Sequence, residues 1–309
     1  MRRKLACTSK FADDAIKPLG APTTPQPLCF NAIFGGSETQ RKRSMRMPVI
    51  FFGHGSPVIA LQDNVTTRLW RRMALRVEQE YGRPRAIVAI SGHWLTRGIG
   101  ATAMARPKTI HDFGSSLPRP LFDIQYPAPG SPDVAREVAA LLAPEPVVLD
   151  ESHWGLDHGT WSVLCKAWPD ADIPVVQLSL DIRRTPRDHY ELALRLKPLR
   201  DAGVLVIGTG NIVHNLPRMN WDSQNCEPYS WAKAFDDHIV QAVTAADADA
   251  VIDYETLGEA AMLSVPSPDH YWPLLYALGA ADKDDPVVFE TRHIEYGSLS
   301  MTSIGWWPI

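Results

Sequence analysis

Val49-Ile-Phe-Phe-Gly-His-Gly-Ser-Pro57 is a short apolar run that leads into a histidine within a loop rich in Gly and Pro. Two later segments, 86–93 and 204–214, repeat this pattern of an apolar run followed by a histidine. Continuous apolar runs of this length are typical of buried strands in a parallel sheet. The loops that follow such strands converge on one crevice, where α/β proteins bind their ligands. We therefore expect a common site that contains His54, His93 and His214.

The chain from residue 47 onward alternates between apolar runs and segments with helical periodicity. Predicted helices cover 63–81, 131–142 and 185–199, and further predicted strands cover 85–91, 173–180 and 204–208. Two short segments, 287–289 and 298–304, are expected to be edge strands. Strands that alternate with helices indicate one sheet with helices on both faces. The predicted fold is a single α/β domain, residues 47–309, with a central, mostly parallel or mixed sheet flanked by helices on both faces.

Residues 1–46 differ from the rest of the chain in charge and composition. They contain nine Lys or Arg and three acidic residues, whereas the remainder contains 22 basic and 32 acidic residues. The segment has four prolines and no sustained periodicity. We expect it to be disordered, or to be an N-terminal extension wrongly added before a start at Met45 or Met47. A targeting segment is the third alternative.

Composition also argues against several classes of partner. The acidic body offers no basic patch for phosphates, so nucleic acid is not an expected partner. No apolar run reaches the length of a membrane span, about 18 residues, so no membrane partner is expected. The four cysteines form no CxxC pair, which favours free thiols and a cytoplasmic location. The oligomeric state stays open.

The sequence contains ten histidines, and their surroundings separate the candidates from the others. His270 lies between a Pro-rich turn and an apolar segment and joins the three histidines above as a fourth candidate. Neutral imidazole is a common ligand of Zn, Fe, Cu and Ni, so this set predicts a metal site. The alternative is that these histidines only hydrogen-bond loop carbonyls. The sequence contains no HExxH, GxSxG, GxGxxG or P-loop motif. No motif therefore supports a zinc protease, a serine hydrolase, a dinucleotide-binding protein or an NTP-binding protein.

Two other histidines carry expectations of their own. His189 lies in a helical pattern flanked by charged residues, and we expect it to face solvent. His111 lies in the aromatic, Pro-rich segment 98–130, whose length favours a functional loop. It is either a polar residue at the rim of the site or a substrate contact.

Six segments stand in order along the chain: Gly53-His54-Gly-Ser-Pro, Ser91-Gly-His93-Trp, Tyr126-Pro-Ala-Pro-Gly130, Gly155-Leu-Asp-His158-Gly-Thr-Trp161, Gly208-Thr-Gly-Asn-Ile-Val-His214-Asn-Leu and Pro268-Asp-His270-Tyr-Trp-Pro-Leu. Together they resemble the DOPA 4,5-dioxygenase-like branch of the class III extradiol ring-cleavage dioxygenases. The resemblance covers essentially all of residues 47–309 and none of 1–46.

The resemblance implies a non-haem Fe(II) enzyme that uses O2 to open a catechol ring beside its diol. It implies metal ligation by His54, His93 and His270, with His214 beside the metal as an acid/base or as a fourth ligand. It also implies a role for His158 in substrate binding or proton transfer. Weaker matches place Tyr126 and His111 in the pocket wall that binds the substrate. The implied partners are a small-molecule catechol, whose identity stays open, and O2.

The implied ligand set leaves alternatives. Related catechol-cleaving enzymes bind their metal with two histidines and one carboxylate. In this sequence the residue that matches the third ligand position is a histidine, His270. Three neutral imidazoles leave a divalent metal its full charge, which favours a catecholate but is also the ligand set of hydrolytic zinc sites. A zinc-dependent hydrolase, with Zn in the same site, is therefore one alternative. A non-catalytic metal-binding interaction protein is the second, and a structural zinc site, usually closed and rich in thiolates, is the third.

Overall fold

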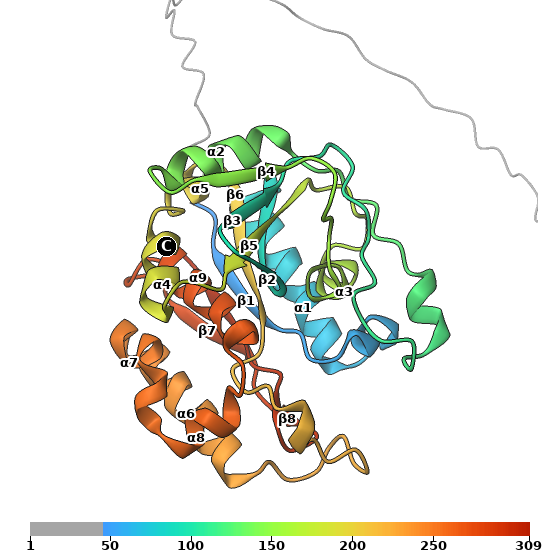
Figure 1. Cartoon of the computed structure of the whole chain (residues 1–309), viewed down its shortest axis with the longest axis vertical. Helices are drawn as coiled ribbons and strands as arrows, with labels where there is room; N and C mark the ends of the chain where they lie inside the picture. Colours follow the sequence, from blue (N-terminus) through green and yellow to red (C-terminus); the bar gives the residue numbers. More distant parts are fainter. Residues whose placement is uncertain (1–45) are drawn as a thin grey trace, which may run out of the picture. The chain divides into compact units, whose positions relative to one another are not determined.

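Figure 1 shows the computed structural model, which describes residues 46–309. The predicted extension at 1–46 lies outside the described residues, apart from Arg46. The strands are β1 (Val49–Gly53), β2 (Ala86–Thr96), β3 (Ile99–Thr102), β4 (Val147–Asp150), β5 (Val175–Asp181), β6 (Val204–Gly210), β7 (Val287–Thr291), β8 (Ile294–Glu295), β9 (Leu299–Ser300) and β10 (Ser303–Trp306).

The three predicted helical segments, 63–81, 131–142 and 185–199, are helical, and the first and last are each divided into two helices. The α-helices are α1 (Val65–Arg76), α2 (Pro132–Leu142), α3 (His158–Ala167), α4 (Pro186–Leu194), α5 (Pro198–Asp201), α6 (Ser230–Thr244), α7 (Ala248–Ile252), α8 (Glu259–Ser264) and α9 (Trp272–Ala280). The short helices are η1 (Pro57–Leu61), η2 (Val77–Tyr81), η3 (Arg119–Asp123), η4 (Leu216–Arg218), η5 (Tyr254–Leu257) and η6 (Pro268–His270). Among residues 46–309, no helix combines the length and the apolar character that crossing a membrane requires.

Eight of the strands form one mixed sheet in the order β4-β3-β5-β2-β6-β1-β10-β7. The central strands β5, β2, β6 and β1 are parallel, and β10 pairs antiparallel with both β1 and β7. The predicted mixed sheet is therefore confirmed. The expectation of two edge strands was right for β7 and wrong for β10, which is buried between two neighbours. β3, inside the segment that we expected to be a loop, was missed.

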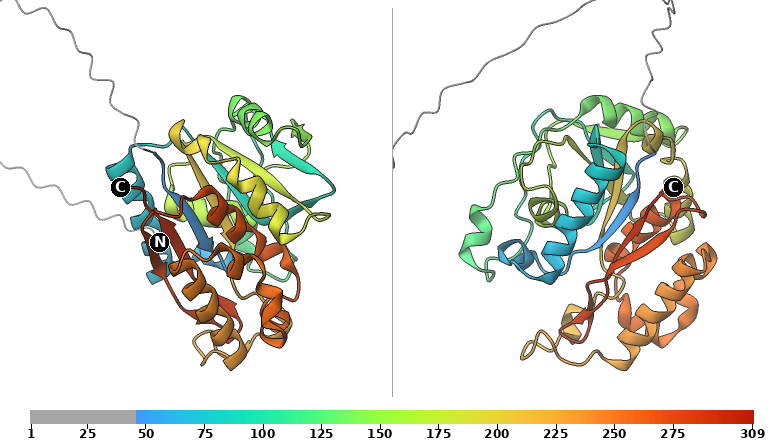
Figure 2. Two further views of the ribbon diagram at one scale, coloured as in Figure 1. Left: turned by 90° about the vertical axis from the view of Figure 1, so that its left-hand side faces the viewer. Right: turned by 180° about the vertical axis from the view of Figure 1, so that it is seen from behind.

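Helices cover both faces of this sheet, as Figure 2 shows from the side and from behind. On β1, Val49 and Phe51 face a core cluster that includes apolar residues of α2, α4, α6 and α9. Ile50 and Phe52 face a second cluster that includes residues of α1 and α3. A strand buried on both faces needs apolar residues at every position, which explains the continuous apolar run in its sequence.

The amino ends of β1 and β6 are held together by one buried guanidinium. Arg200 is fully buried, and its Nε donates to the carbonyl of Met47 at 2.7 Å. Its Nη2 lies 2.6 Å from Asp285, and its Nη1 donates to the carbonyl of Ala280 and to Asp282, each at 3.2 Å. The donors of this one side chain thus meet oxygens of two distant segments, Met47 and 280–285, which fixes this end of the sheet.

Candidate metal centre

The carboxyl ends of the same strands bring histidines together, as the sequence predicted. His54 directly follows β1, and its backbone N–H donates to the carbonyl of Gly210 at the end of β6. His93 lies in the outer half of β2, where the pairing with β5 shifts register. His270 ends η6, and its carbonyl accepts from the N–H of Asn211 at 2.9 Å. The three residues therefore come from three distant parts of the chain.

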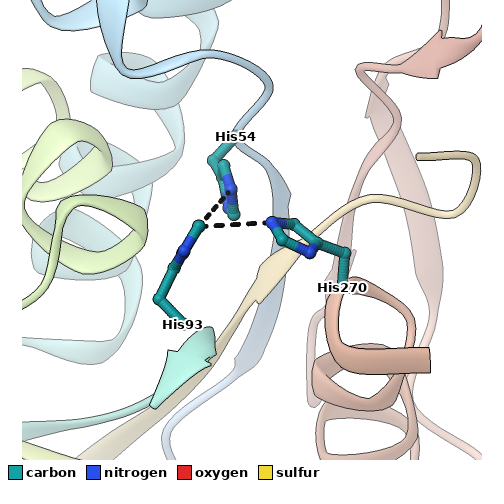
Figure 3. Close-up of side chains that lie close together, drawn as sticks. All are labelled: His54, His93 and His270. Atoms are coloured by element: carbon teal, nitrogen blue, oxygen red, sulfur yellow. Dashed lines mark hydrogen bonds between the residues drawn. The ribbon is translucent and has the colours of Figure 1, made fainter. Parts of the chain in front are cut away.

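The side chains of His54, His93 and His270 point toward one another (Figure 3). Nε2 of His93 lies 3.4 Å from Nε2 of His54 and 3.2 Å from Nε2 of His270. Three nitrogens that each lie about 2.0–2.1 Å from one ion at tetrahedral angles are about 3.3 Å apart. The spacing therefore fits a metal ion bound by the three-histidine cluster, as we call these residues.

The cluster is held in a form that can bind a cation. Burial, together with the charges of the neighbouring histidines, lowers the pKa of His54 and His93 well below the usual histidine value. Both imidazoles are therefore neutral near pH 7 and keep a lone pair, which is the state that a metal ligand requires.

Two carboxylates that sequence reasoning missed lie behind the cluster. Asp269 contacts Nδ1 of His270 at 2.5 Å, and Asp112 lies 3.5 Å from Nδ1 of His93. Burial alone raises the pKa of Asp269, but the hydrogen bond and the charge of His270 outweigh it and lower that pKa. Carboxylates in this position orient ligating histidines. The available signals were weak: Asp269 precedes His270, and Asp112 lies in the long aromatic segment.

His214 and His158 flank the cluster on different sides. The ring of His214 stacks on His270, with centroids 3.7 Å apart and planes 5° from parallel. It lies outside the group of three whose ligand atoms converge. Burial, followed by the charge of His270, lowers the pKa of His214 well below its usual value. His158 begins α3 and lies against His93, with ring centroids 3.8 Å apart.

His111 and Tyr126, predicted to line the substrate pocket, both have partners within the chain. His111 packs against Phe113, Phe122 and Trp161, and its Nε2 lies 3.0 Å from the carbonyl of Ile124. Tyr126 is buried, and its hydroxyl donates to the carbonyl of Trp168 at 3.0 Å. These contacts support the segment that carries both residues, and a substrate contact for either one stays a prediction.

The expectation that His189 faces solvent was wrong. It is fully buried between α4 and α9, where its ring lies 4.3 Å from that of Trp272 and its Nδ1 lies 3.3 Å from the hydroxyl of Tyr276. Burial, followed by the charge of Arg184, lowers its pKa to about 4. The charged residues beside it in sequence lie on other faces of the helix.

Glycine at the start of α3 lets the elements of the site approach closely. A Cβ on Gly159 would lie 2.5 Å from Oγ of Ser91, 2.7 Å from Cδ2 of His93 and 3.3 Å from Cε1 of His54. Any larger residue would therefore displace a neighbour. The small residues around the predicted histidines thus make room for other parts of the site.

Comparison with known proteins points to one family. The sequence profile of the family described as "Catalytic LigB subunit of aromatic ring-opening dioxygenase" matches residues 48–305. A 4,5-DOPA dioxygenase extradiol of Escherichia coli K12 is 46% identical over 264 residues, which cover 84% of this chain and 95% of that protein. The Beta vulgaris protein of the same name is 34% identical over 281 residues, covering 87% and 99%. The crystal structure of an uncharacterized Escherichia coli K12 protein has a TM-score of 0.72 and 42% identity, covering 84% of this chain and 99% of that one.

Proposed function

The chain belongs to this LigB family and is therefore an extradiol dioxygenase that cleaves a catechol ring with O2; from that premise we propose its metal, its site residues and its substrate. The convergence of the Nε2 atoms of His54, His93 and His270 carries the proposal, because it fits one metal ion. These three residues are the proposed ligands. The proposed substrate is DOPA or a closely related catechol, which the names of the relatives above support.

The proposed metal of the active enzyme is Fe(II). Bound iron supplies the one-electron and O2 chemistry that ring opening requires. Zinc suits the same three imidazoles but has no redox chemistry, so a zinc-loaded chain is expected to bind the catechol without consuming O2.

Proton transfer is assigned to the histidines beside the cluster. A catechol must lose hydroxyl protons as it binds, and a neutral imidazole within reach can accept one. We assign the acid/base role to His214, because its ring is neutral and stacks on His270. His158 is the second candidate, with its Nδ1 turned toward Asp112 and its Nε2 left for the substrate.

Oxygen uptake by the full chain, reconstituted with Fe(II) under anaerobic conditions, tests the proposal. A panel of DOPA, caffeate and protocatechuate tests the proposed substrate and the ring-cleaving activity independently. We expect O2 to be consumed in proportion to a yellow ring-opened product, fastest with DOPA, and no uptake by the zinc-loaded chain or by His54→Ala. O2 uptake that is fastest with another catechol would overturn only the proposed substrate. A chain that binds one metal ion but consumes no O2 with any catechol would overturn the assigned chemistry.

We also propose that residues 47–309 form the catalytic domain. The family match begins at residue 48 and the first strand at Val49. A chain that starts at Met47 loses the ion pairs of Arg46 with Asp201 and Asp282. Surface ion pairs contribute about 1 kcal/mol or less each, so we expect slightly lower stability and an unchanged kcat. A large loss of kcat would contradict this boundary.

A further inference from the structure

We propose that Asp112 is a positioning residue that holds two histidines of the site at once, His93 and His158. One carboxylate oxygen lies 3.0 Å from Nδ1 of His158, and the other lies 3.5 Å from Nδ1 of His93. The backbone N–H of His158 also donates to Asp112, at 2.9 Å. The inference rests on the proposed function, because His93 is a proposed ligand and His158 a proposed proton acceptor.

The loop that carries Asp112 is attached to the segment that leads into α3. The N–H of Ile110 donates to the carbonyl of Leu156 at 2.7 Å, and the N–H of Leu156 donates to the carbonyl of Lys108 at 2.8 Å. The indole of Trp161 donates to the carbonyl of Ile110 at 2.8 Å. These bonds fix the chain on both sides of the contact, so the carboxylate is in place before metal or substrate binds.

The carboxylate determines which nitrogen of each ring carries the proton. The carboxylate of Asp112 faces Nδ1 of both rings, at 3.0 Å from His158 and 3.5 Å from His93. An ionised carboxylate can only accept hydrogen bonds. Nδ1 of His158 makes no hydrogen bond in this structure, but a lone pair on Nδ1 of either ring would be repelled by the nearby carboxylate. The hydrogen of each neutral ring is therefore favoured on Nδ1, which leaves a lone pair on Nε2. In His93 that atom faces His54 and His270, and in His158 it is left to accept a substrate proton.

Asp112 differs in this respect from the other carboxylate of the site. Asp269 contacts Nδ1 of His270, and its charge also acts on the neighbouring His214, but among the described residues it forms no hydrogen bond or ion pair with His158. Asp112 joins a metal ligand to His158, the second candidate for proton transfer, so its loss should affect metal binding and any proton transfer through His158. The pair Asp112→Asn and Asp269→Asn therefore separates the two contributions.

The test compares these two variants with wild type and with Asp285→Asn. The last of these disrupts the buried pair with Arg200 at the other end of the sheet and so controls for lost stability. Two-bond ¹H–¹⁵N NMR spectra of the metal-free full chain report which ring nitrogen of each histidine carries hydrogen. Metal titration and steady-state kinetics at saturating Fe(II) complete the comparison.

In wild type we expect hydrogen on Nδ1 of His93 and His158. Asparagine can donate to Nδ1, so in Asp112→Asn we expect hydrogen on Nε2 of His158. Loss of such a partner typically lowers metal affinity about 10–100-fold. We also expect kcat at saturating metal to fall about 10²–10⁴-fold, the range of general acid–base catalysis, with little change in KM. Asp269→Asn should weaken metal binding and leave His158 unchanged, and Asp285→Asn should lower Tm alone.

Three results would overturn the inference. Asp112→Asn could keep hydrogen on Nδ1 of both rings, or it could keep wild-type kcat and metal affinity. A second metal ion bound by His93, Asp112 and His158 would make Asp112 a ligand. The NMR measurement does not depend on turnover: the expected tautomers in the metal-free chain, together with no O2 uptake by the Fe(II)-loaded chain, would support the positioning role and count against the proposed function.

Discussion

The two ends of β1 and β6 both bury polar side chains, but the side chains at the two ends have different partners. At the amino end, the donors of Arg200 meet the carboxylates of Asp285 and Asp282 and two backbone carbonyls. At the carboxyl end, the imidazoles of the three-histidine cluster turn nitrogens toward one another. Within residues 46–309, no acidic residue belongs to this group.

This difference separates a structural site from a functional one. Buried polar groups normally find partners within the protein, and a group that does not calls for an explanation. The guanidinium at the amino end is satisfied by the chain itself, so its role is to join segments. We propose that the converging nitrogens at the carboxyl end bind a cation from solution. The next four predictions test this contrast, starting with the largest expected effect.

The substitution His54→Ala changes only the carboxyl end. We expect the rate of O2 uptake with a catechol to fall by about 10⁴-fold or more, as when a member of a catalytic unit is removed. The metal-free chain should lose stability mainly through the cavity that the imidazole leaves, because Nδ1 of His54 is buried without a hydrogen-bond partner. Metal analysis, oxygen uptake and thermal unfolding measure these effects. A variant that binds metal and turns over like wild type would contradict the assignment.

The substitution Arg200→Met changes only the amino end. It leaves Asp285, which is 8% exposed, without its counter-charge. Removing one partner of a buried pair typically costs about 3–5 kcal/mol. We expect a loss of that size in the free energy of urea unfolding, with kcat unchanged for the folded fraction. Lower kcat at unchanged stability would show that this end belongs to the functional site.

His189 shows whether a buried, neutral histidine is enough to make a site. Its pKa of about 4 in the folded chain lies below the ordinary value of 6.5. Between these pH values the unfolded chain binds a proton that the folded chain does not. The stabilisation is therefore complete above pH 6.5 and is lost as pH falls toward 4, by about 3 kcal/mol in total.

Urea unfolding of wild type and His189→Phe at several pH values measures this contribution. As the pH falls, the unfolding free energy of wild type should fall relative to that of His189→Phe. The two chains should have equal kcat at pH 7.5. A pH-independent difference would show that His189 is protonated equally in the folded and unfolded chains.

The smallest expected effect comes from the glycine that brings α3 close to the cluster. Gly159→Ala places a methyl group against Ser91 and His93, and overpacking of this kind typically costs about 1–3 kcal/mol. We expect weaker metal binding with a nearly normal fold. Gly114→Ala is the matched control, because its nearest heavy atom would be 3.8 Å away. Equal metal affinity in the two variants would mean that the site tolerates the shift.

The parts of the fold that the sequence predicted are those with a local signal. The central strands stood out because their inner residues, 49–53, 86–91 and 204–208, are buried on both faces and are apolar or small. β2 and β6 continue beyond their predicted ends, to Thr96 and Gly210. Ile99–Thr102 is only four residues long and follows a glycine, so it had no comparable signal. The position of β10 between β1 and β7 depends on pairing between distant segments, which no local pattern encodes.

The same limit applies to the site. The strand-end pattern and the motif around His270 identified the residues of the three-histidine cluster. Asp112 was missed because its partner His158 lies 46 residues away along the chain. His189 was misassigned because neighbouring charges in sequence do not show which face of a helix is buried. Contacts between distant segments decide both cases.

The most direct test of the contrast is thermal unfolding of wild type, Arg200→Met and His54→Ala, each with and without Fe(II) under anaerobic conditions. A ligand that binds only the folded chain stabilises it by about 4 kcal/mol at a thousand times its Kd. We predict that Fe(II) raises the Tm of wild type and of Arg200→Met by similar amounts, and leaves His54→Ala unchanged. An equal rise in His54→Ala, or no rise in wild type, would contradict the account.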